Sequence, residues 1–170
     1  MTLAEHIQAV QARIAAAAEK AGRDPSEVTL VAATKVQTSE TIRAAIAAGI
    51  TVCGENRAQE FTQHWQDGAY KGAKVHFIGH LQKNKLKYLV GKVDMIESVD
   101  SEELIRLIDK RAQNLGIVQD ILIEVNIGGE ASKSGVKPEE AEALVALAAS
   151  LSGVEPRGLM AIPPVAHEPG

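Results

Sequence analysis

Runs of strand-forming residues alternate with helical patterns along most of this chain, and this alternation restricts its fold more than any other feature. The β-rich runs are residues 28–34, 50–53, 74–78, 94–98, 120–126 and 155–162. The intervening stretches with apolar residues at helical spacing are residues 39–48, 56–67, 81–90, 101–115 and 138–151. Strands separated by a helix are normally parallel, with right-handed connections and helices covering the sheet. The sequence therefore predicts an α/β protein made of repeated βα units.

Several predicted helices carry recognisable start signals. An N-terminal helix is expected to begin after Thr2, which can act as the N-cap, with Glu5 three residues later to complete a capping box. The later helices are expected to begin at Ser39, Ser101 and Pro138, because serine and proline both favour helix N-termini. These signals separate the strands from the helices that follow them.

Two architectures satisfy this alternation, an open doubly wound sheet and a TIM-type barrel. The chain has neither a G-x-G-x-x-G after its first strand nor a P-loop, so the nucleotide-binding open sheets lose support. We therefore predict a (βα) TIM-type barrel in a single domain, residues 1–170. The barrel has about six βα units where a closed one has eight, so it is expected to be incomplete at its C-terminal side.

Composition and charge exclude several classes of function. A net charge of -4 and an aromatic content of 3% supply neither the basic face nor the stacking side chains that nucleic-acid binding needs. No window is long and apolar enough to span a bilayer, and the N-terminus lacks a signal-peptide pattern. The single cysteine, Cys53, is expected to be a small buried side chain, and no zinc-ligand spacing is present. We expect a cytoplasmic protein with no nucleic-acid, membrane or metal partner.

Polar residues and glycines follow most of the predicted strands. These strand-end residues are Thr34, Lys35, Gly54, Glu55, Asn56, Gly79, His80, Ser98, Asn126 and Met160. In barrels of this kind the chemistry lies where strands hand over to helices, so these positions outline a candidate mouth for a small ligand. Loops after strands are polar in any fold, however, and Lys35 can equally be a solvated residue at the end of an apolar strand.

A lysine at such a mouth can perform Schiff-base chemistry. Partial burial of Lys35 would favour its free amine, which attacks a carbonyl. Aldolases hold their substrate in this way, and proteins that use pyridoxal 5'-phosphate (PLP) hold the aldehyde of their cofactor. The residues alone leave both chemistries open.

Five motifs decide between them by resemblance. In chain order they are ATKVQ, CGENRAQEF, HFIGHLQKNK, VNIGGEASKSG and RGLMAI. Together they closely resemble the YggS/PROSC family of pyridoxal phosphate homeostasis proteins, which share the fold of the alanine racemase N-terminal barrel. The resemblance implies a PLP-binding protein of intracellular PLP homeostasis that acts without catalytic turnover. PLP-dependent apo-enzymes are the protein partners that it suggests.

The resemblance also assigns residues. The cofactor lysine falls on Lys35, which is expected to hold PLP as an internal aldimine, and the Asn of the GENRAQE motif is Asn56, expected near the cofactor ring. The Met of the RGLM motif is Met160, expected to line the same pocket. Asn126 is expected first to tie neighbouring loops together by hydrogen bonds and second to contact the ligand. The segment 82–85 is expected to begin a helix, either as a phosphate-attracting helix start or as a solvated charged turn.

Members of the resembled family continue beyond the last residue of this sequence. Their later loops supply most of the phosphate contacts, which agrees with the usual place of phosphate sites in barrels. The chain is therefore expected to be part of a longer protein, to hold the lysine without those loops, and to bind PLP weakly or unspecifically through Lys35 by itself.

Two alternative functions remain at this point. A fold-related amino-acid racemase would need a second acid or base, which in alanine racemases is a tyrosine of an additional domain, and this chain offers only Tyr70 and Tyr88. A cofactor-free Schiff-base aldolase would need a second lysine or acid beside Lys35, and Glu55 is the one acidic residue among the strand ends.

Overall fold

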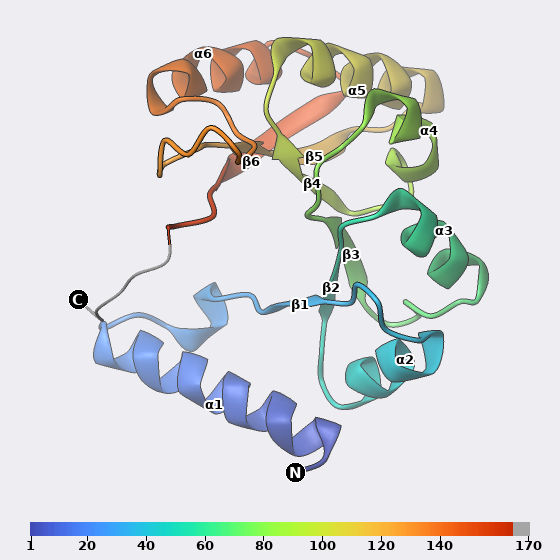
Figure 1. Cartoon of the computed structure of the whole chain (residues 1–170), viewed down its shortest axis with the longest axis vertical. Helices are drawn as coiled ribbons and strands as arrows, with labels where there is room; N and C mark the ends of the chain where they lie inside the picture. The colour runs from blue at the N-terminus through green and yellow to red at the C-terminus, as the bar shows by residue number, and fades with distance from the viewer. Residues whose placement is uncertain (165–170) are drawn as a thin grey trace. The chain divides into compact units, whose positions relative to one another are not determined.

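The structure, a computed structural model, describes residues 1–164 and contains the predicted alternation of strands and helices (Figure 1). The strands are β1 (Val31–Ala33), β2 (Val52–Glu55), β3 (Lys74–Phe77), β4 (Met95–Val99), β5 (Gln119–Glu124) and β6 (Val154–Met160). The α-helices are α1 (Leu3–Lys20), α2 (Ser39–Ala47), α3 (Ala58–Gln66), α4 (Leu86–Leu89), α5 (Glu102–Leu115) and α6 (Pro138–Ala149). Two short 3-10 helices are η1 (Pro25–Glu27) and η2 (Lys83–Lys85). The strand order in the sheet is β1-β2-β3-β4-β5-β6, the same as along the chain.

The parallel pairing predicted from the sequence is confirmed for the pairs β1–β2, β4–β5 and β5–β6. The chain divides into two compact units, residues 1–76 and 77–170, and each is described by itself. The expectation of a single domain therefore stays a prediction.

In the first unit, the helices cover a short parallel pair of strands. β1 and β2 pair in register from Val31 opposite Val52 to Ala33 opposite Gly54. Ile42 of α2 and Phe61 of α3 are completely buried, because α2 and α3 each turn an apolar side toward the strands. The capping box predicted at the start of α1 is confirmed, with Thr2 and Glu5 bonded to each other's backbone N–H.

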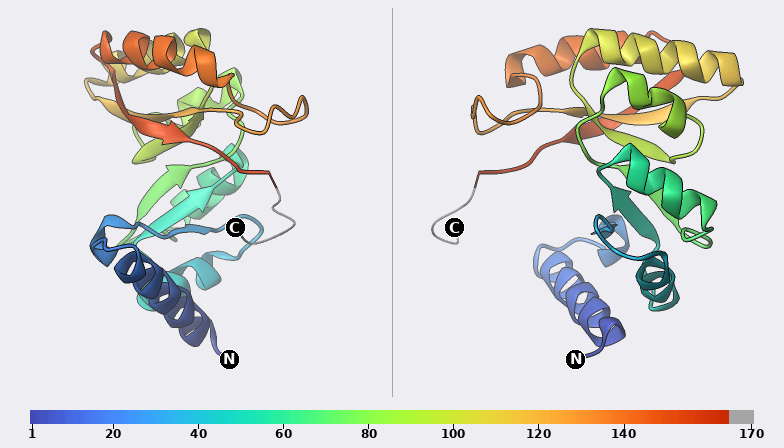
Figure 2. Two further views of the ribbon diagram at one scale, coloured as in Figure 1. Left: turned by 90° about the vertical axis from the view of Figure 1, so that its left-hand side faces the viewer. Right: turned by 45° about the vertical axis from the view of Figure 1, so that its right-hand side comes forward.

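In the second unit, α5 and α6 lie side by side along one face of the strands β4, β5 and β6 (Figure 2). The core between these layers consists of fully buried apolar side chains, Ile96, Ile105, Ile108, Ile121 and Ile123. The predicted starts of α5 and α6 are confirmed, since Ser101 caps α5 and Pro138 is the first residue of α6.

Several predicted boundaries are wrong. The first strand covers only Val31–Ala33 instead of residues 28–34, because β1 is the edge strand and its early residues have no paired backbone. The helix expected at residues 81–90 is a 3-10 turn followed by the four residues of α4. The predicted start at Ser39 is confirmed, because Ser39 is the first residue of α2 and Thr38 caps it, with its hydroxyl accepting from the Thr41 N–H.

In residues 1–164, no helix combines the length and the hydropathy needed to cross a membrane. Within the same residues, histidine, cysteine, aspartate and glutamate side chains form no cluster suited to a metal ion.

Candidate functional site

Lys35 lies in a tight turn directly after β1. The turn is closed by a hydrogen bond from the Gln37 N–H to the Thr34 carbonyl oxygen, with an N–O distance of 3.2 Å. Thr34 is buried and its N–H donates to the Gly54 carbonyl of the neighbouring strand. The Lys35 side chain itself is exposed, so the partial burial expected from the sequence is wrong for the described residues. The reason is its position, since Lys35 follows the edge strand and lies outside the paired backbone.

The residue after Lys35 has an uncommon backbone conformation. Val36 has a φ of 55°, and it is the one non-glycine residue with positive φ in the part of the chain that the structure describes. The left-handed region is disfavoured for a β-branched side chain because Cβ approaches the backbone. A turn in this conformation needs support from neighbouring groups.

Asn56 occupies the matching place after β2. Ala33 and Gly54 are paired, so Lys35 and Asn56 both stand two residues beyond this pair, at the same edge of the two strands. The Oδ1 atom of Asn56 is buried, and it has no hydrogen-bond partner among the described residues. Buried polar atoms are normally satisfied, so this one is available to a ligand.

A buried carboxylate lies beneath the turn, and the sequence did not predict it. Glu55 is completely buried, and its Oε1 atom accepts from the Thr34 hydroxyl at 2.5 Å and from the Tyr70 hydroxyl at 2.8 Å. The Nδ1 atom of His64 lies 3.1 Å from the same oxygen. The Oε2 atom of Glu55 has no hydrogen-bond partner within residues 1–164. These side chains come from the turn after β1, from β2, from α3 and from the loop after α3, a separation that no local sequence pattern signals.

This carboxylate affects the acidity of its neighbours. Burial raises the pKa of the Tyr70 hydroxyl, and the hydrogen bond to Glu55 raises it further. Burial also raises the pKa of the Cys53 thiol to about 11, with the charge of Glu55 as the second cause. Both groups therefore stay protonated at neutral pH. Cys53 is fully buried, which confirms the prediction of a small buried side chain.

The second unit has its own pair of predicted site residues, Asn126 and Met160. They stand at the ends of neighbouring strands, where the Val125 N–H donates to the Met160 carbonyl at 2.8 Å. The Asn126 side-chain amide donates to the Glu130 carbonyl at 2.9 Å, so it bonds within its own loop, and the expected link between neighbouring loops stays a prediction. The loop passes so close to the strand end that a Cβ at Gly135 would lie 2.7 Å from the backbone nitrogen of Asn126. Contact of Asn126 or Met160 with a ligand stays a prediction.

Other polar groups of the second unit also lie near strand ends. Glu124, the last residue of β5, is buried, and burial raises the pKa of its carboxyl, with the charge of Asp100 as a second cause and that of His80 partly offsetting it. In the segment 82–85, Lys83 forms an ion pair with Glu103. This pairing supports the interpretation of a solvated charged turn.

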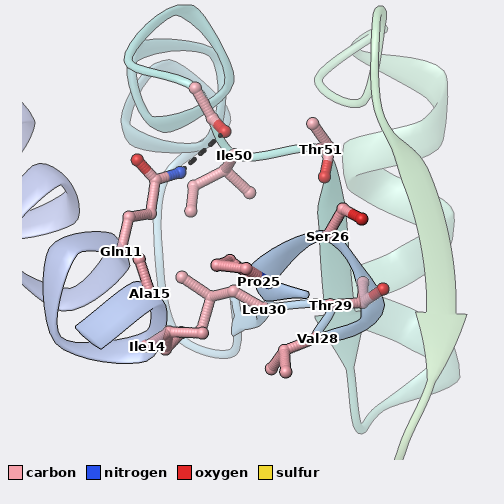
Figure 3. Close-up of a pocket in the computed structure, with 11 residues that line it drawn as sticks. Gln11, Ile14, Ala15, Pro25, Ser26, Val28, Thr29, Leu30, Ile50 and Thr51 are labelled. Carbon is pink, nitrogen blue, oxygen red and sulfur yellow. Dashed lines mark hydrogen bonds between the residues drawn. The ribbon is translucent and has the colours of Figure 1, made fainter. Parts of the chain in front are cut away.

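A pocket of about 320 Å³ in the first unit lies at the opposite strand ends (Figure 3). Its lining comes from α1, η1 and the residues that precede β1 and β2, and Gln11 reaches across it to donate to the Gly49 carbonyl at 3.2 Å. Neither Lys35 nor Asn56 is among the lining residues. The predicted site and this pocket are therefore separate.

Comparison with known proteins gives this chain a family. The model of the alanine racemase N-terminal domain matches residues 6–170. The pyridoxal phosphate homeostasis protein of Aquifex aeolicus is 44% identical over 169 residues, which cover 99% of this chain and 74% of that protein. The chain belongs to the family of pyridoxal phosphate homeostasis proteins. The family resemblance drawn from the five motifs is confirmed.

Solved structures agree with this family. A crystal structure of a protein from Bifidobacterium adolescentis has a TM-score of 0.91 and 39% identity, covering 98% of this chain and 71% of that one. PipY of Synechococcus elongatus, solved with PLP bound, has a TM-score of 0.79 and 29% identity, covering 97% of this chain and 72% of that one. The predicted alanine racemase type of (βα) fold is thereby confirmed.

The family motif GENRAQE can now be followed in the structure. It starts at the end of β2, where Glu55 is buried and Asn56 follows, and it continues into α3, where Glu60 faces the turn after β1. The Glu60 carboxylate accepts a hydrogen bond from the Val36 N–H at 3.0 Å. In this chain, two glutamates of the family motif, Glu55 and Glu60, therefore bond the residues on either side of Lys35.

Proposed function

We propose that this chain binds PLP covalently through Lys35 and serves in PLP homeostasis without catalytic turnover. The observation that carries the proposal is the position of Lys35, an exposed amine at the carboxyl end of β1 in a member of this family. PLP bound to the related PipY gives independent support.

The residues of the first unit fit such a cofactor. The amine of Lys35 is reachable from solvent, and the Asn56 Oδ1 atom at the same strand edge is buried without a partner among residues 1–164. An aromatic ring with a hydroxyl substituent offers a hydrogen-bond donor to such an oxygen. Met160, the last residue of β6, and Asn126, two residues after β5, are further proposed cofactor contacts, as the family resemblance and their strand-end positions suggest.

The chemistry divides simply between cofactor and protein. PLP supplies an aldehyde that condenses with a primary amine and releases water. Lys35 contributes the amine and gives up its proton to solvent before it attacks, since its side chain is exposed. The turn at residues 34–37 sets the direction from which that amine approaches.

A role without turnover is supported by the surroundings of Tyr70 and Glu55. Racemisation needs a second acid or base, and Tyr70 is buried with its hydroxyl donating to Glu55. Glu55, the acid that an aldolase would use, is itself buried beneath Thr34. We further propose that the protein acts in the cytoplasm and that PLP-dependent apo-enzymes receive its cofactor, as the family's homeostatic role suggests.

The test is the visible spectrum of the protein mixed with PLP, followed by borohydride reduction and peptide mapping. We expect a lysine-bound cofactor band and a reduced adduct on Lys35, both absent in Lys35→Ala. Lys74→Ala is the matched control, because Lys74 is an exposed lysine at the opposite end of a strand in the same unit. A band that survives in Lys35→Ala, or racemisation that depends on Lys35, would refute the proposal.

A further inference from the structure

The turn that carries Lys35 holds a strained residue with little packing to support it. Val36 has a φ of 55°, and 77% of the residue is exposed to solvent. Its side chain therefore contributes almost no contact that could keep the backbone in the left-handed region. Strained conformations persist when surrounding groups fix them, so the restraint must act on the backbone itself.

Two side chains of α3 supply that restraint. The Glu60 carboxylate accepts from the Val36 N–H at 3.0 Å, and the His64 Nε2 atom lies 3.1 Å from the Gln37 carbonyl oxygen. Residues four apart share one face of a helix, so Glu60 and His64 hold the backbone of the consecutive residues Val36 and Gln37 from a single helix. We call this pair the α3 clamp.

On the side away from the turn, His64 lies next to two buried polar side chains, Glu55 and Tyr70. A carbonyl oxygen only accepts hydrogen bonds, so the Nε2 atom carries the hydrogen that is donated to Gln37. The Nδ1 atom then faces the Glu55 carboxylate at 3.1 Å and the Tyr70 hydroxyl at 3.2 Å. The same Glu55 oxygen accepts from the Thr34 hydroxyl, so this carboxylate bonds the start of the turn and lies next to the histidine that bonds its end.

We infer that Glu60 and His64 are positioning residues for Lys35. They hold the strained turn in the one conformation that presents the amine to PLP, and neither side chain touches the cofactor in this role. The inference rests on the proposed function, since it explains how the amine of that site is oriented. If these hydrogen bonds only stabilised the first unit, their loss would not change how Lys35 reacts with PLP.

The experiment compares Glu60→Ala with Asp67→Ala in the full chain. Asp67 is the matched control because it is an exposed carboxylate at the end of the same helix that binds Ser39 of α2 and not the turn. We expect Glu60→Ala to raise the dissociation constant for PLP at Lys35 about tenfold, the size typical for loss of a charge-assisted hydrogen bond. Asp67→Ala should leave it unchanged, because within residues 1–164 Asp67 makes no contact with the turn.

A rescue variant separates positioning from general stability. Glycine adopts a φ of 55° without steric cost, so Val36→Gly removes the strain that the clamp opposes. The double variant Val36→Gly with Glu60→Ala should therefore have a dissociation constant for PLP close to that of Val36→Gly alone. A structural role of Glu60 predicts no such recovery, because the glycine restores none of its contacts.

Amide exchange at Val36 gives a readout that does not need PLP. The clamp predicts faster exchange of this N–H in Glu60→Ala than in Asp67→Ala. Equal exchange rates, or equal dissociation constants in the two variants, would overturn the inference even where the unaltered chain binds PLP at Lys35. Absence of any PLP adduct on Lys35 in the unaltered chain would instead refute the proposed function, and the positioning role together with it.

Discussion

At the scale of single residues, Glu124 has the clearest consequence for pH dependence. Burial and the charge of Asp100 raise the pKa of its carboxyl above the ordinary value of 4.5. The folded chain therefore holds this proton more tightly than the unfolded chain does. Its contribution to stability is fully present below pH 4.5 and is lost as the pH rises through the raised value.

Glu124→Gln removes this charge and should make the chain more stable than the unaltered protein at about pH 7.5. The gain should disappear when the same urea unfolding is measured below pH 4.5, where the glutamate is protonated. Glu142→Gln, an exposed position on α6, is the control and should show little change at either pH. A gain for Glu124→Gln that is equal at both pH values would contradict this explanation.

The predictions from the sequence differ most clearly from the structure at individual side chains. Lys35 and Asn56 were predictable as strand-end residues, because the end of a strand is a local property. The contacts of Glu55 with His64 and Tyr70 were not, since nine and fifteen residues separate the partners and only the fold brings them together. Lys35 was expected to be partly buried at a barrel mouth, whereas it is exposed in the turn that follows the edge strand β1.

At the scale of elements, the turn between α6 and β6 is fixed by close contact with α5. The Gly153 N–H donates to the Asp109 carboxylate at 2.7 Å, and a Cβ at Gly153 would lie 2.5 Å from the Asp109 carbonyl oxygen. We expect Gly153→Ala to lower the free energy of unfolding by about 2–3 kcal/mol, through overpacking and a weakened hydrogen bond. The measurement is urea unfolding followed by circular dichroism.

Gly116→Ala is the matched control for this turn. Gly116 ends α5 with a φ of 67°, and a Cβ there would meet no atom within 4 Å. Gly116→Ala should lower the free energy of unfolding by about 1 kcal/mol, the cost of a left-handed conformation alone. Equal losses for the two alanine variants would show that close approach to α5 contributes nothing at Gly153.

Elements whose signals are local were predicted well. The cap of α1 at Thr2 and the cap of α5 at Ser101 follow from short side-chain contacts within the first turn of each helix. The limits of β1 depend on which backbone groups a neighbouring strand pairs, and the sequence of β1 carries no information about that. The sequence predicts a helix over residues 81–90, because apolar residues recur there at helical spacing, but only Leu86–Leu89 form an α-helix.

At the scale of the whole molecule, each compact unit has a core of its own, which gives a test of the predicted single domain. Phe61 is fully buried in the first unit and Ile121 in the second. Truncation of such side chains leaves a cavity and costs about 2–5 kcal/mol. Hydrogen exchange then reports which amides lose protection.

We expect Phe61→Ala to accelerate exchange mainly in residues 1–76, and Ile121→Ala mainly in residues 77–164. The reason is that a cavity weakens first the contacts of its own unit, and local openings become more frequent there. The two variants are each other's controls, since both remove a fully buried apolar side chain. Equal acceleration throughout residues 1–164 in both variants would contradict separate opening and support the single domain predicted from the sequence, because one cooperative unit transmits the loss to every amide.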